Sequence, residues 1–546
     1  SNDPIRATTT GATFTTLPAP DLIVSSVSVP VPAAIQSGAE LTIRWILTNA
    51  GAAPVSDRFY DRLLVRNNTT SSNLRDVALL YDPLAAGNSP IPSGGTLVGP
   101  NLHGVFGRSA ASVAGYDYSP ALRSSGLVWT PVSLDDIDLL DHDLFADHEP
   151  YEVFEVLQRE APVFWHEGPE DGDGFWCVTR YDDVVHVLKN ARLFSSQVNG
   201  TARIDWMEPD VLEARRNFME TDAPLHTQWR RLFAREFTPK SVGQYRGFLV
   251  ELVDRVLDRA LPQGEFDFVH EVASPIPIRV LGHLLGIPEE MLDHLVELGD
   301  RMIIDTDPDI AHVLKGSVEA EEYKYLPFGS EAAAELCEMG RPMIQARRER
   351  PTEDVLSILA NAEIDGCPLG RVELDNNFAL FVVAGNETTR QGMALGTLAL
   401  LRQPEAMADL RAHPEIMPTA IDEIIRIASP VWHFRRTATE DTEIRGVPIR
   451  KGQRVVVWFA AANRDPDAFP DPHRLDLRRK RDEHASFGGG GPHFCLGAHL
   501  ARLEIEVVIE RLLARTSSIE LAGTPRRLRS NFTNGLKELP VRVTPA

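Results

Sequence analysis

Cysteine is scarce in this chain, with four residues among 546 and no two of them in a CxxC arrangement. They are Cys177, Cys337, Cys367 and Cys495. So few cysteines exclude a disulfide framework as the source of stability in a chain of this length. We therefore expect a reducing compartment and a cytoplasmic protein.

Long apolar runs are missing as well. The longest, residues 378–384 and 455–462, fall far below the ~20 residues that a membrane-spanning helix needs. The first residues show no basic-then-apolar signal peptide. We expect a soluble protein without a transmembrane segment.

Basic side chains are outnumbered, because 55 Lys and Arg stand against 78 Asp and Glu for a formal net charge of −23. A nucleic-acid partner would require a basic face for phosphate. Tight docking on an anionic membrane surface is disfavoured for the same reason. We expect no nucleic-acid partner.

The composition changes character near residue 130. Residues 18–98 are rich in small and β-branched residues, and short alternating segments at 22–29, 40–47 and 60–65 are separated by turn-formers. This pattern predicts a small antiparallel β-sandwich-like module over residues 1–98. The stretch PDLIVSSVSVP…GAELTIRWILTNAG resembles immunoglobulin-like adhesion modules of bacterial surface proteins.

Residues 99–131, which begin GPNLHGVFGRSAASVAGYDYSP, resemble the middle of a class I cytochrome c. Covalent haem attachment in that family requires a CxxCH motif. No cysteine precedes Cys177, so we expect this segment to be a remnant or linker that holds no haem.

From residue 132 to 546, patterns with apolar residues at i, i+3, i+4 and i+7 dominate. They predict a mainly α domain with minor β. The clearest expected helices are 151–160, 247–260, 374–401, 414–427 and 496–515, and the clearest strands are 175–179 and 454–459.

The strongest chemical signal is the segment HASFGGGGPHFCLGAHLARLE around Cys495. A thiolate metal ligand needs a loop whose backbone amides point at the sulfur, and glycines allow such a close backbone path. A helix that begins after Cys495 would favour the anionic form through its N-terminal dipole. The alternative is a buried structural cysteine that follows a glycine-rich turn.

Three further motifs accompany this loop in order: AGNETT, EIIR and ANRDPDAFPDP. With them, residues 132–546 resemble the cytochromes P-450. The resemblance implies the P-450 fold, a haem b cofactor and Cys495 as the axial ligand of its iron. The loop residues that it assigns to the cofactor are Phe487, Gly489, Gly491 and Gly497.

One departure concerns spacing, since Phe487 lies one residue further from Cys495 than in the commonest form of the family's loop. The run Gly488–Gly491 causes this shift. A tetraglycine loop also occurs in the branch of bacterial enzymes that oxidise sterols and methyl-branched lipids.

Glu387 and Thr388 stand in the middle of an apolar helix, where polar groups without partners cost several kcal/mol. The resemblance implies a catalytic relay, in which Thr388 would hydrogen-bond bound dioxygen and Glu387 would help to bring in protons. Ala384 and Gly385 would border the cofactor, and Gly385 would permit a local opening of the helix. The structural alternative is a Thr388 hydroxyl bonded one turn back, with Glu387 at the surface.

Glu423 and Arg426 are three residues apart on one helix face and can pair. The resemblance implies a buried structural network with an arginine that precedes the cysteine loop. We expect that arginine to be Arg464 or Arg474, and we assign the network to folding and haem retention.

The two haem propionates require cationic or donor partners. His226 and Arg230 match the family's HxxxR element, and Arg436 and His493 match its two other usual positions. Arg435 is the less favoured alternative to Arg436.

The run Arg478-Arg479-Lys480-Arg481 is a basic island in an acidic protein. It could dock an acidic ferredoxin, although a solvated loop explains it equally well. No Rossmann fingerprint or flavin domain is evident, so we expect electrons from a separate ferredoxin and ferredoxin reductase.

The resemblance therefore implies a monooxygenase that uses dioxygen to hydroxylate a hydrophobic small-molecule substrate. AGNETTR, PVWHFRRTATEDTEIRG, the tetraglycine loop and the tail NFTNGLKELPVRV, which would form a turn into the pocket, are similar to the sterol, branched-lipid and terpene branch. The alkane-oxidising branch remains open. The alternatives are a peroxide-driven peroxygenase and a surface-binding protein that acts through residues 18–98.

Overall fold

The computed structural model describes six strands between residues 12 and 98 by their backbone, and residues 134–546 except 135–136, 147, 169–173, 202–203, 205–207, 303–322 and 481–482. The chain forms two compact units, Ser1–Ser133 and Leu134–Ala546.

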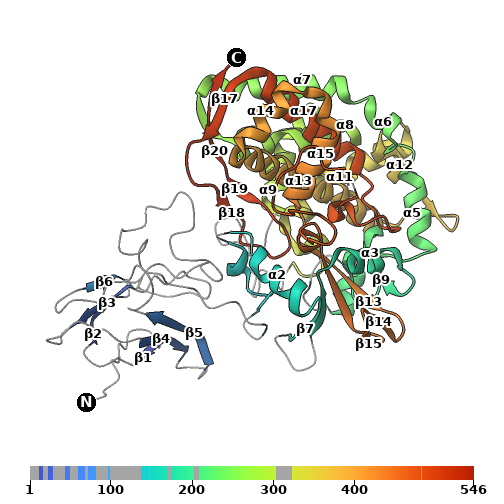
Figure 1. The fold of residues 1–546 in the computed structure, drawn as a ribbon. Coiled ribbons are helices and arrows are strands. Elements are labelled where there is room, and N and C mark those ends of the chain that lie inside the picture. Colours follow the sequence, from blue (N-terminus) through green and yellow to red (C-terminus); the bar gives the residue numbers. More distant parts are fainter. Residues whose placement is uncertain are drawn as a thin grey trace. The chain divides into compact units, whose positions relative to one another are not determined.

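The first unit contains two three-stranded antiparallel sheets, in the orders β1-β4-β5 and β2-β3-β6 (Figure 1). Their strands are β1 (Ala12–Thr15), β2 (Leu22–Ser28), β3 (Arg44–Asn49), β4 (Phe59–Asn67), β5 (Ser72–Tyr81) and β6 (Thr96–Val98). The sandwich-like packing and the immunoglobulin-like character stay predictions. The cytochrome c-like segment 99–131 lies outside the described residues.

The second unit is mainly helical, as predicted (Figure 1). Its α-helices are α2 (Tyr151–Glu160), α3 (Tyr181–Lys189), α4 (Pro209–Arg215), α5 (Leu225–Phe233), α6 (Pro239–Gly243), α7 (Arg246–Ala260), α8 (Pro275–Leu285), α9 (Leu292–Met302), α11 (Glu331–Glu349), α12 (Val355–Ala360), α13 (Arg371–Arg402), α14 (Pro404–Ala412), α15 (Met417–Ala428), α16 (Phe459–Ala462) and α17 (Ala498–Arg515).

Helix α13 is the axis of this unit, because α8, α11, α15 and α17 all pack against it. Gly370 caps its N-terminus: the Gly370 N–H donates to Oε2 of Glu373 (2.8 Å) and is thereby satisfied. Most of its later residues are buried on every side, as expected of a core helix. Any polar residue in its middle therefore faces protein or an interior site.

The main sheet has the order β7-β8-β16-β13-β9, and β16 pairs with β8 in parallel and with β13 in antiparallel register. Its strands are β7 (Val163–His166), β8 (Phe175–Val178), β9 (Phe194–Ser195), β13 (His433–Ala438) and β16 (Arg454–Trp458). A second sheet has the order β10-β20-β17, and three two-stranded hairpins complete the set. Their strands are β10 (Glu265–Asp267), β17 (Thr516–Leu521) and β20 (Pro540–Pro545), then β11 (Glu363–Ile364) with β12 (Cys367–Pro368), β14 (Thr442–Ile444) with β15 (Val447–Ile449), and β18 (Arg526–Arg527) with β19 (Leu536–Glu538).

The five expected helices and two expected strands are all present. The helix over 151–160 is confirmed to the residue, and the long central helix extends to 371–402, beyond the predicted 374–401. The helix predicted at 496–515 begins at Ala498, because Gly497 occupies the position before its first turn.

Candidate active site

Cys495 lies in the loop between the 3-10 turn Ala485–Phe487 and α17. Its backbone N–H donates to the Phe487 carbonyl (2.8 Å), which closes the loop into a compact turn. Gly497 forms the N-terminal cap of α17 and directs its own N–H at the Cys495 sulfur. A helix N-terminus thus lies beside the thiol, an arrangement that favours a negative charge there.

The thiol is exposed, yet burial raises the pKa of Cys495. The Gly497 amide, Arg230 and Arg502 lower that pKa by smaller amounts, so it stays above its usual value. A group that is both reachable and poorly hydrated faces an enclosed space and not bulk water. Cys495 therefore opens onto the interior.

The tetraglycine run packs against the end of α3. A Cβ on Gly491 would lie 2.0 Å from the Leu188 carbonyl oxygen, which no side chain could tolerate. Gly489 has a φ of +59°, and a Cβ there would lie 3.1 Å from Leu188 Cδ1. These glycines thus allow the loop to approach α3, a role that the sequence did not predict. A Cβ on Gly497, in contrast, would meet nothing within 4 Å.

Four basic side chains from three distant segments meet close to Cys495. His226 and Arg230 lie one turn apart on α5, Arg436 is on β13, and His493 precedes Cys495 by two residues. The rings of His226 and His493 stack with their centroids 3.8 Å apart. The structure therefore brings together the set that the sequence singled out.

Burial and neighbouring positive charge disfavour the charged forms of the two histidines. Burial, Arg230 and Arg436 lower the pKa of His226 to about 4, although Asp222 acts in the opposite direction. Burial followed by the other three cations lowers the pKa of His493 to about 2. Burial lowers that of Arg436 to about 10.

Within the described residues, none of these four side chains forms an ion pair. Clustered positive charge in a poorly hydrated place is unfavourable unless an anion joins it. The donor set therefore fits a ligand that carries carboxylates, next to a thiol that can bind a metal.

The middle of α13 opens on one side. Ala384 is exposed, and Gly385 and Thr388 are partly exposed, in a helix whose neighbouring residues are mostly buried. The Thr388 hydroxyl donates to the Ala384 carbonyl (2.8 Å), so its oxygen keeps its acceptor capacity. The expected local opening at Gly385 is absent, because α13 is continuous there; instead, a Cβ on Gly385 would lie 2.7 Å from Leu281 Cδ2 of α8.

Glu387 is buried on the same helix, with 7% of its surface exposed. Its Oε2 forms an ion pair with Arg390, and its Oε1 accepts from Gln391 Nε2 (2.9 Å). For Glu387 and Thr388, the structure agrees only in part with the structural alternative to a catalytic relay. Thr388 makes the one-turn-back bond of the structural alternative, whereas Glu387 is not at the surface.

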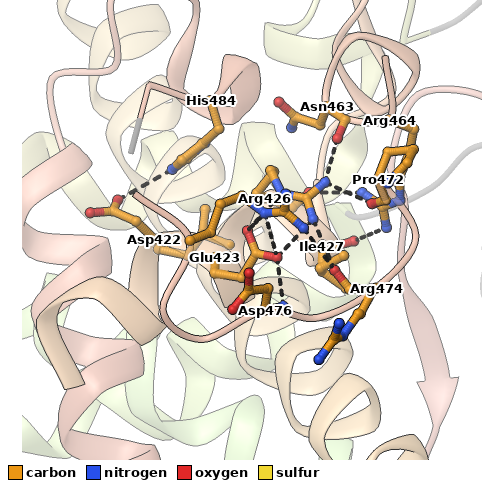
Figure 2. Close-up of polar contacts among 12 residues, drawn as sticks. Asp422, Glu423, Arg426, Ile427, Asn463, Arg464, Pro472, Arg474, Asp476 and His484 are labelled. Atoms are coloured by element: carbon orange, nitrogen blue, oxygen red, sulfur yellow. Dashed lines mark hydrogen bonds and ion pairs between the residues drawn. The ribbon is translucent and has the colours of Figure 1, made fainter. Parts of the chain in front are cut away.

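Figure 2 shows the network around Glu423 and Arg426 on α15. Arg426 donates from Nε to Glu423 Oε2 (2.7 Å) and from a terminal nitrogen to Oε1 (2.8 Å). The same guanidinium also donates to the carbonyls of Asn463 (2.5 Å) and Pro472 (2.9 Å). Both side chains of the pair are almost fully buried.

The arginine that completes this network is Arg479, and the expectation of Arg464 or Arg474 is wrong. Arg479 Nε lies 3.1 Å from each Glu423 oxygen. Arg464 instead donates to the Arg426 and Ile427 carbonyls (3.0 and 2.7 Å), and the contact that Arg474 makes to Arg426 comes from its backbone oxygen (Figure 2).

The position of Arg479 also changes the interpretation of the basic island at residues 478–481. Arg479 turns inward, and Arg478 forms an ion pair with Asp409 on α14. Arg481 lies outside the described residues. The two arginines just before Lys480 are thus engaged within the protein.

Sequence reasoning missed two residues that hold the cysteine loop in place. Asn463 is fully buried; its Oδ1 accepts from the Ala485 N–H (2.6 Å), and its Nδ2 donates to Ser429 and Ser486 (2.8 Å each). Asp422 pairs with both His484 (3.3 Å) and Arg502 (2.7 Å), and so ties α15 to both ends of the loop. The only available signal was the position of Asn463 inside ANRDPDAFPDP.

Comparison with known proteins identifies the family. Residues 289–536 match the family model of the cytochromes P-450. The chain is 37% identical over 419 residues to a steroid C26-monooxygenase of Rhodococcus jostii, covering 74% of this chain and 84% of that one. It is 36% identical over 418 residues to linalool 8-monooxygenase of Pseudomonas putida, covering 75% and 99%.

A solved cytochrome P-450 of Mycobacterium marinum, in complex with pseudoionone, superposes with a TM-score of 0.66 at 35% identity and covers 72% of this chain and 94% of that one. The chain therefore belongs to the cytochrome P-450 superfamily. It is a haem-iron monooxygenase with that family's mainly helical fold. In the part of the chain that the structure describes, no helix is both long and apolar enough to cross a membrane.

Proposed function

We propose that this enzyme uses dioxygen to hydroxylate an aliphatic hydrophobic small molecule, of the sterol, branched fatty lipid, terpene or alkane class. The names of its relatives support this range, since they include a steroid C26-monooxygenase, a linalool 8-monooxygenase and a methyl-branched lipid omega-hydroxylase of Mycobacterium tuberculosis. The tail NFTNGLKELPVRV, at residues 531–543, supports the same branch.

The cofactor is proposed to be haem b, and Cys495 would bind its iron through the thiolate. His226, Arg230, Arg436 and His493 would hold its two propionates, which supply the anion that this cluster requires. Phe487, Gly489, Gly491 and Gly497 would shape the loop on the thiolate side, and Ala384 and Gly385 would border the opposite face. When bound, haem supplies the activation of dioxygen and the oxidising chemistry, which a thiolate ligand promotes.

Thr388 and Glu387 are the proposed catalytic residues. Thr388 donates to the Ala384 carbonyl, and its oxygen can still accept a hydrogen bond from water. Its hydroxyl would turn from that carbonyl to hydrogen-bond dioxygen. Glu387, which Arg390 and Gln391 hold on the same helix, would exchange protons with water.

Electrons are proposed to come from a separate ferredoxin and ferredoxin reductase in the cytoplasm. The four free cysteines support a reducing location. With Arg479 turned inward and Arg478 paired with Asp409, the exposed Lys480 is the remaining described member of the basic run that could contact an acidic partner.

Residues 1–98 and 99–131 are proposed to be an immunoglobulin-like module and a haem-free linker attached to the enzyme domain at 132–546. Removal of residues 1–131 tests this division. Unchanged turnover would support an appendage, and loss of turnover would contradict it.

The observation that carries the proposed function is the meeting of two arginines and two histidines beside Cys495, none of which has an ion-pair partner among the described residues. The test is a titration of the haem-loaded full chain with a sterol, a branched fatty acid, a monoterpene alcohol and an alkane. We expect a low-to-high-spin change with at least one of them, followed by a hydroxylated product with ferredoxin and reductase. No spectral change with any class would contradict the substrate range, and turnover with peroxide alone would support a peroxygenase instead.

A further inference from the structure

The buried Gln391 side chain on α13 makes three hydrogen bonds in the core. It is 0% exposed and touches both Glu387 and the backbone of the C-terminal hairpin β18–β19. Its Oε1 accepts from the Leu536 N–H (2.7 Å). Its Nε2 donates to Glu387 Oε1 (2.9 Å) and to the Leu536 carbonyl (3.3 Å).

These contacts determine the orientation of the amide. A backbone N–H can only donate, so the atom that faces the Leu536 N–H must be the Gln391 oxygen. The Gln391 nitrogen then has to face the Glu387 carboxylate. The hairpin backbone thereby decides which side of Gln391 the carboxylate meets.

The hairpin backbone at Gly535 packs closely against the Gln391 amide. A Cβ on Gly535 would lie 2.4 Å from Gln391 Cδ and 2.7 Å from Leu528 Cδ1. Only glycine lets the hairpin approach so closely, and an amide bonded on both sides has no free direction in which to move. A displacement of residues 535–536 would therefore displace Gln391 as well.

The tip of the hairpin is bound to the segment that leads into β13. Asn534 N–H donates to the Pro430 carbonyl (2.9 Å), and Asn534 Nδ2 donates to the Ala428 carbonyl (2.9 Å). Trp432 N–H in turn donates to the Phe532 carbonyl (2.9 Å). Hydrogen bonds thus connect the end of α15 and the segment before β13 to the hairpin tip, and the hairpin to Glu387 through Gln391.

We propose that Gln391 is a positioning residue that couples the C-terminal hairpin to the Glu387 carboxylate. With the hairpin in place, Gln391 holds Oε1 while Arg390 holds Oε2, so both oxygens are engaged within the protein. A shift of the hairpin releases Oε1 to accept a hydrogen bond from water. The inference rests on the proposed role of Glu387 and deepens it, because it makes proton exchange at this carboxylate depend on the hairpin.

The test uses the full chain loaded with haem and the variant Gln391→Met, which keeps the side-chain length and removes all three hydrogen bonds. Thr397→Val is the matched control, since Thr397 is equally buried on α13 and its hydroxyl has no hydrogen-bond partner among the described residues. Gly535→Ala displaces the amide without deleting it, and serves as a second variant if Gln391→Met folds poorly.

Two readouts are compared: amide hydrogen exchange in the peptide that contains Leu536, and the solvent isotope effect with the yield of product per reductant consumed. We expect about tenfold faster exchange of the Leu536 N–H in Gln391→Met, the factor for one lost hydrogen bond. We also expect an altered solvent isotope effect and a lower yield, with both unchanged in Thr397→Val.

Faster exchange with an unaltered isotope effect and yield would overturn the inference, because Gln391 would then be purely structural. Unaltered exchange would overturn it too. Failure of the proposed function would look different, since the unmodified chain would then lack the reduced carbon-monoxide spectrum of a thiolate-bound haem.

Discussion

The network around Glu423 and the cation cluster around His493 use the same kinds of side chain and satisfy them in opposite ways. In the first, Glu423 accepts from Arg426, and backbone carbonyls take further donors of that guanidinium (Figure 2). Glu423 also accepts from Arg479. In the second, cations stand together without an ion-pair partner among the described residues.

The difference separates a part of the molecule that holds the fold from a part that holds a ligand. In the Glu423 network the opposite charges neutralise one another within the protein, and they stabilise the segment before Cys495. In the cluster around His493 the buried positive charges have no ion-pair partner, and this lowers the stability of the protein until an anion binds. Substitutions in the two clusters should therefore affect the empty protein in opposite directions.

The largest effect is expected for Glu423→Gln. It leaves two buried guanidinium groups without their carboxylate, and such a loss costs about 3–5 kcal/mol of unfolding free energy. Chemical denaturation of the haem-free chain measures this value. Glu415→Gln, at an exposed position near the start of the same helix, is the control and should change little. Equal stability of the two variants would contradict the structural role of Glu423.

Glu149 is expected to behave like Glu423. Burial raises its pKa, but Arg527 (2.8 Å) and Arg402 outweigh burial and bring the pKa to about 2. A lowered folded-state pKa contributes stability above the ordinary value of 4.5, and this is lost as the pH falls from there toward 2. We expect Glu149→Gln to remove about 3 kcal/mol at neutral pH.

Stability measured between pH 7 and 3 checks this pH dependence. The unmodified chain should lose stability more steeply below pH ~4.5 than Glu149→Gln does. Parallel curves for the two proteins would show that the Glu149–Arg527 pair contributes nothing. Glu160→Gln, which alters an exposed pair with Arg159, is the control.

The cation cluster should respond in the opposite sense. Arg230→Met removes one positive charge from the cluster and so should leave the haem-free chain as stable as before, or slightly more so. Haem affinity should fall about 10- to 100-fold, since one charge-assisted hydrogen bond is lost. Haem transfer to an acceptor protein measures the affinity, and Arg231→Met, on the exposed face of α5, is the control. A destabilised haem-free chain with normal haem affinity would place Arg230 with the structural network.

The smallest effect is expected for Arg478→Ala. Its pair with Asp409 is largely exposed, so its loss should change stability by less than about 0.5 kcal/mol. Thermal denaturation beside Arg479→Ala, which should be strongly destabilising, checks the assignment. Equal losses would mean that the two adjacent arginines are not divided between surface and core.

Much of the second unit could be read from the sequence, because its helices carry strong apolar periodicity. The segments 151–160 and 454–459 needed only local pattern, and the order of the motifs AGNETT, EIIR and FGGGGPHFC identified the family. His226, Arg230, Arg436 and His493 were selected by resemblance, and the structure brings them together.

The predictions that failed, and the contacts that were not predicted, depend on the paths of segments without regular secondary structure. Arg479 reaches Glu423 only because the segment before the cysteine loop folds back over α15, and no periodicity encodes such a return. The packing of Gly491 against Leu188 and the contact of Gln391 with Leu536 likewise join distant segments. For the same reason a run of basic letters could not reveal that Arg478 and Arg479 face different surroundings.

The most direct test of the account is the reduced carbon-monoxide difference spectrum of the full chain, compared with Cys495→Ser. We expect the thiolate-shifted Soret band that gives the family its name in the unmodified chain, and its loss in Cys495→Ser. A chain without that band, or a Cys495→Ser variant that keeps it, would contradict the assignment of Cys495 as the iron ligand.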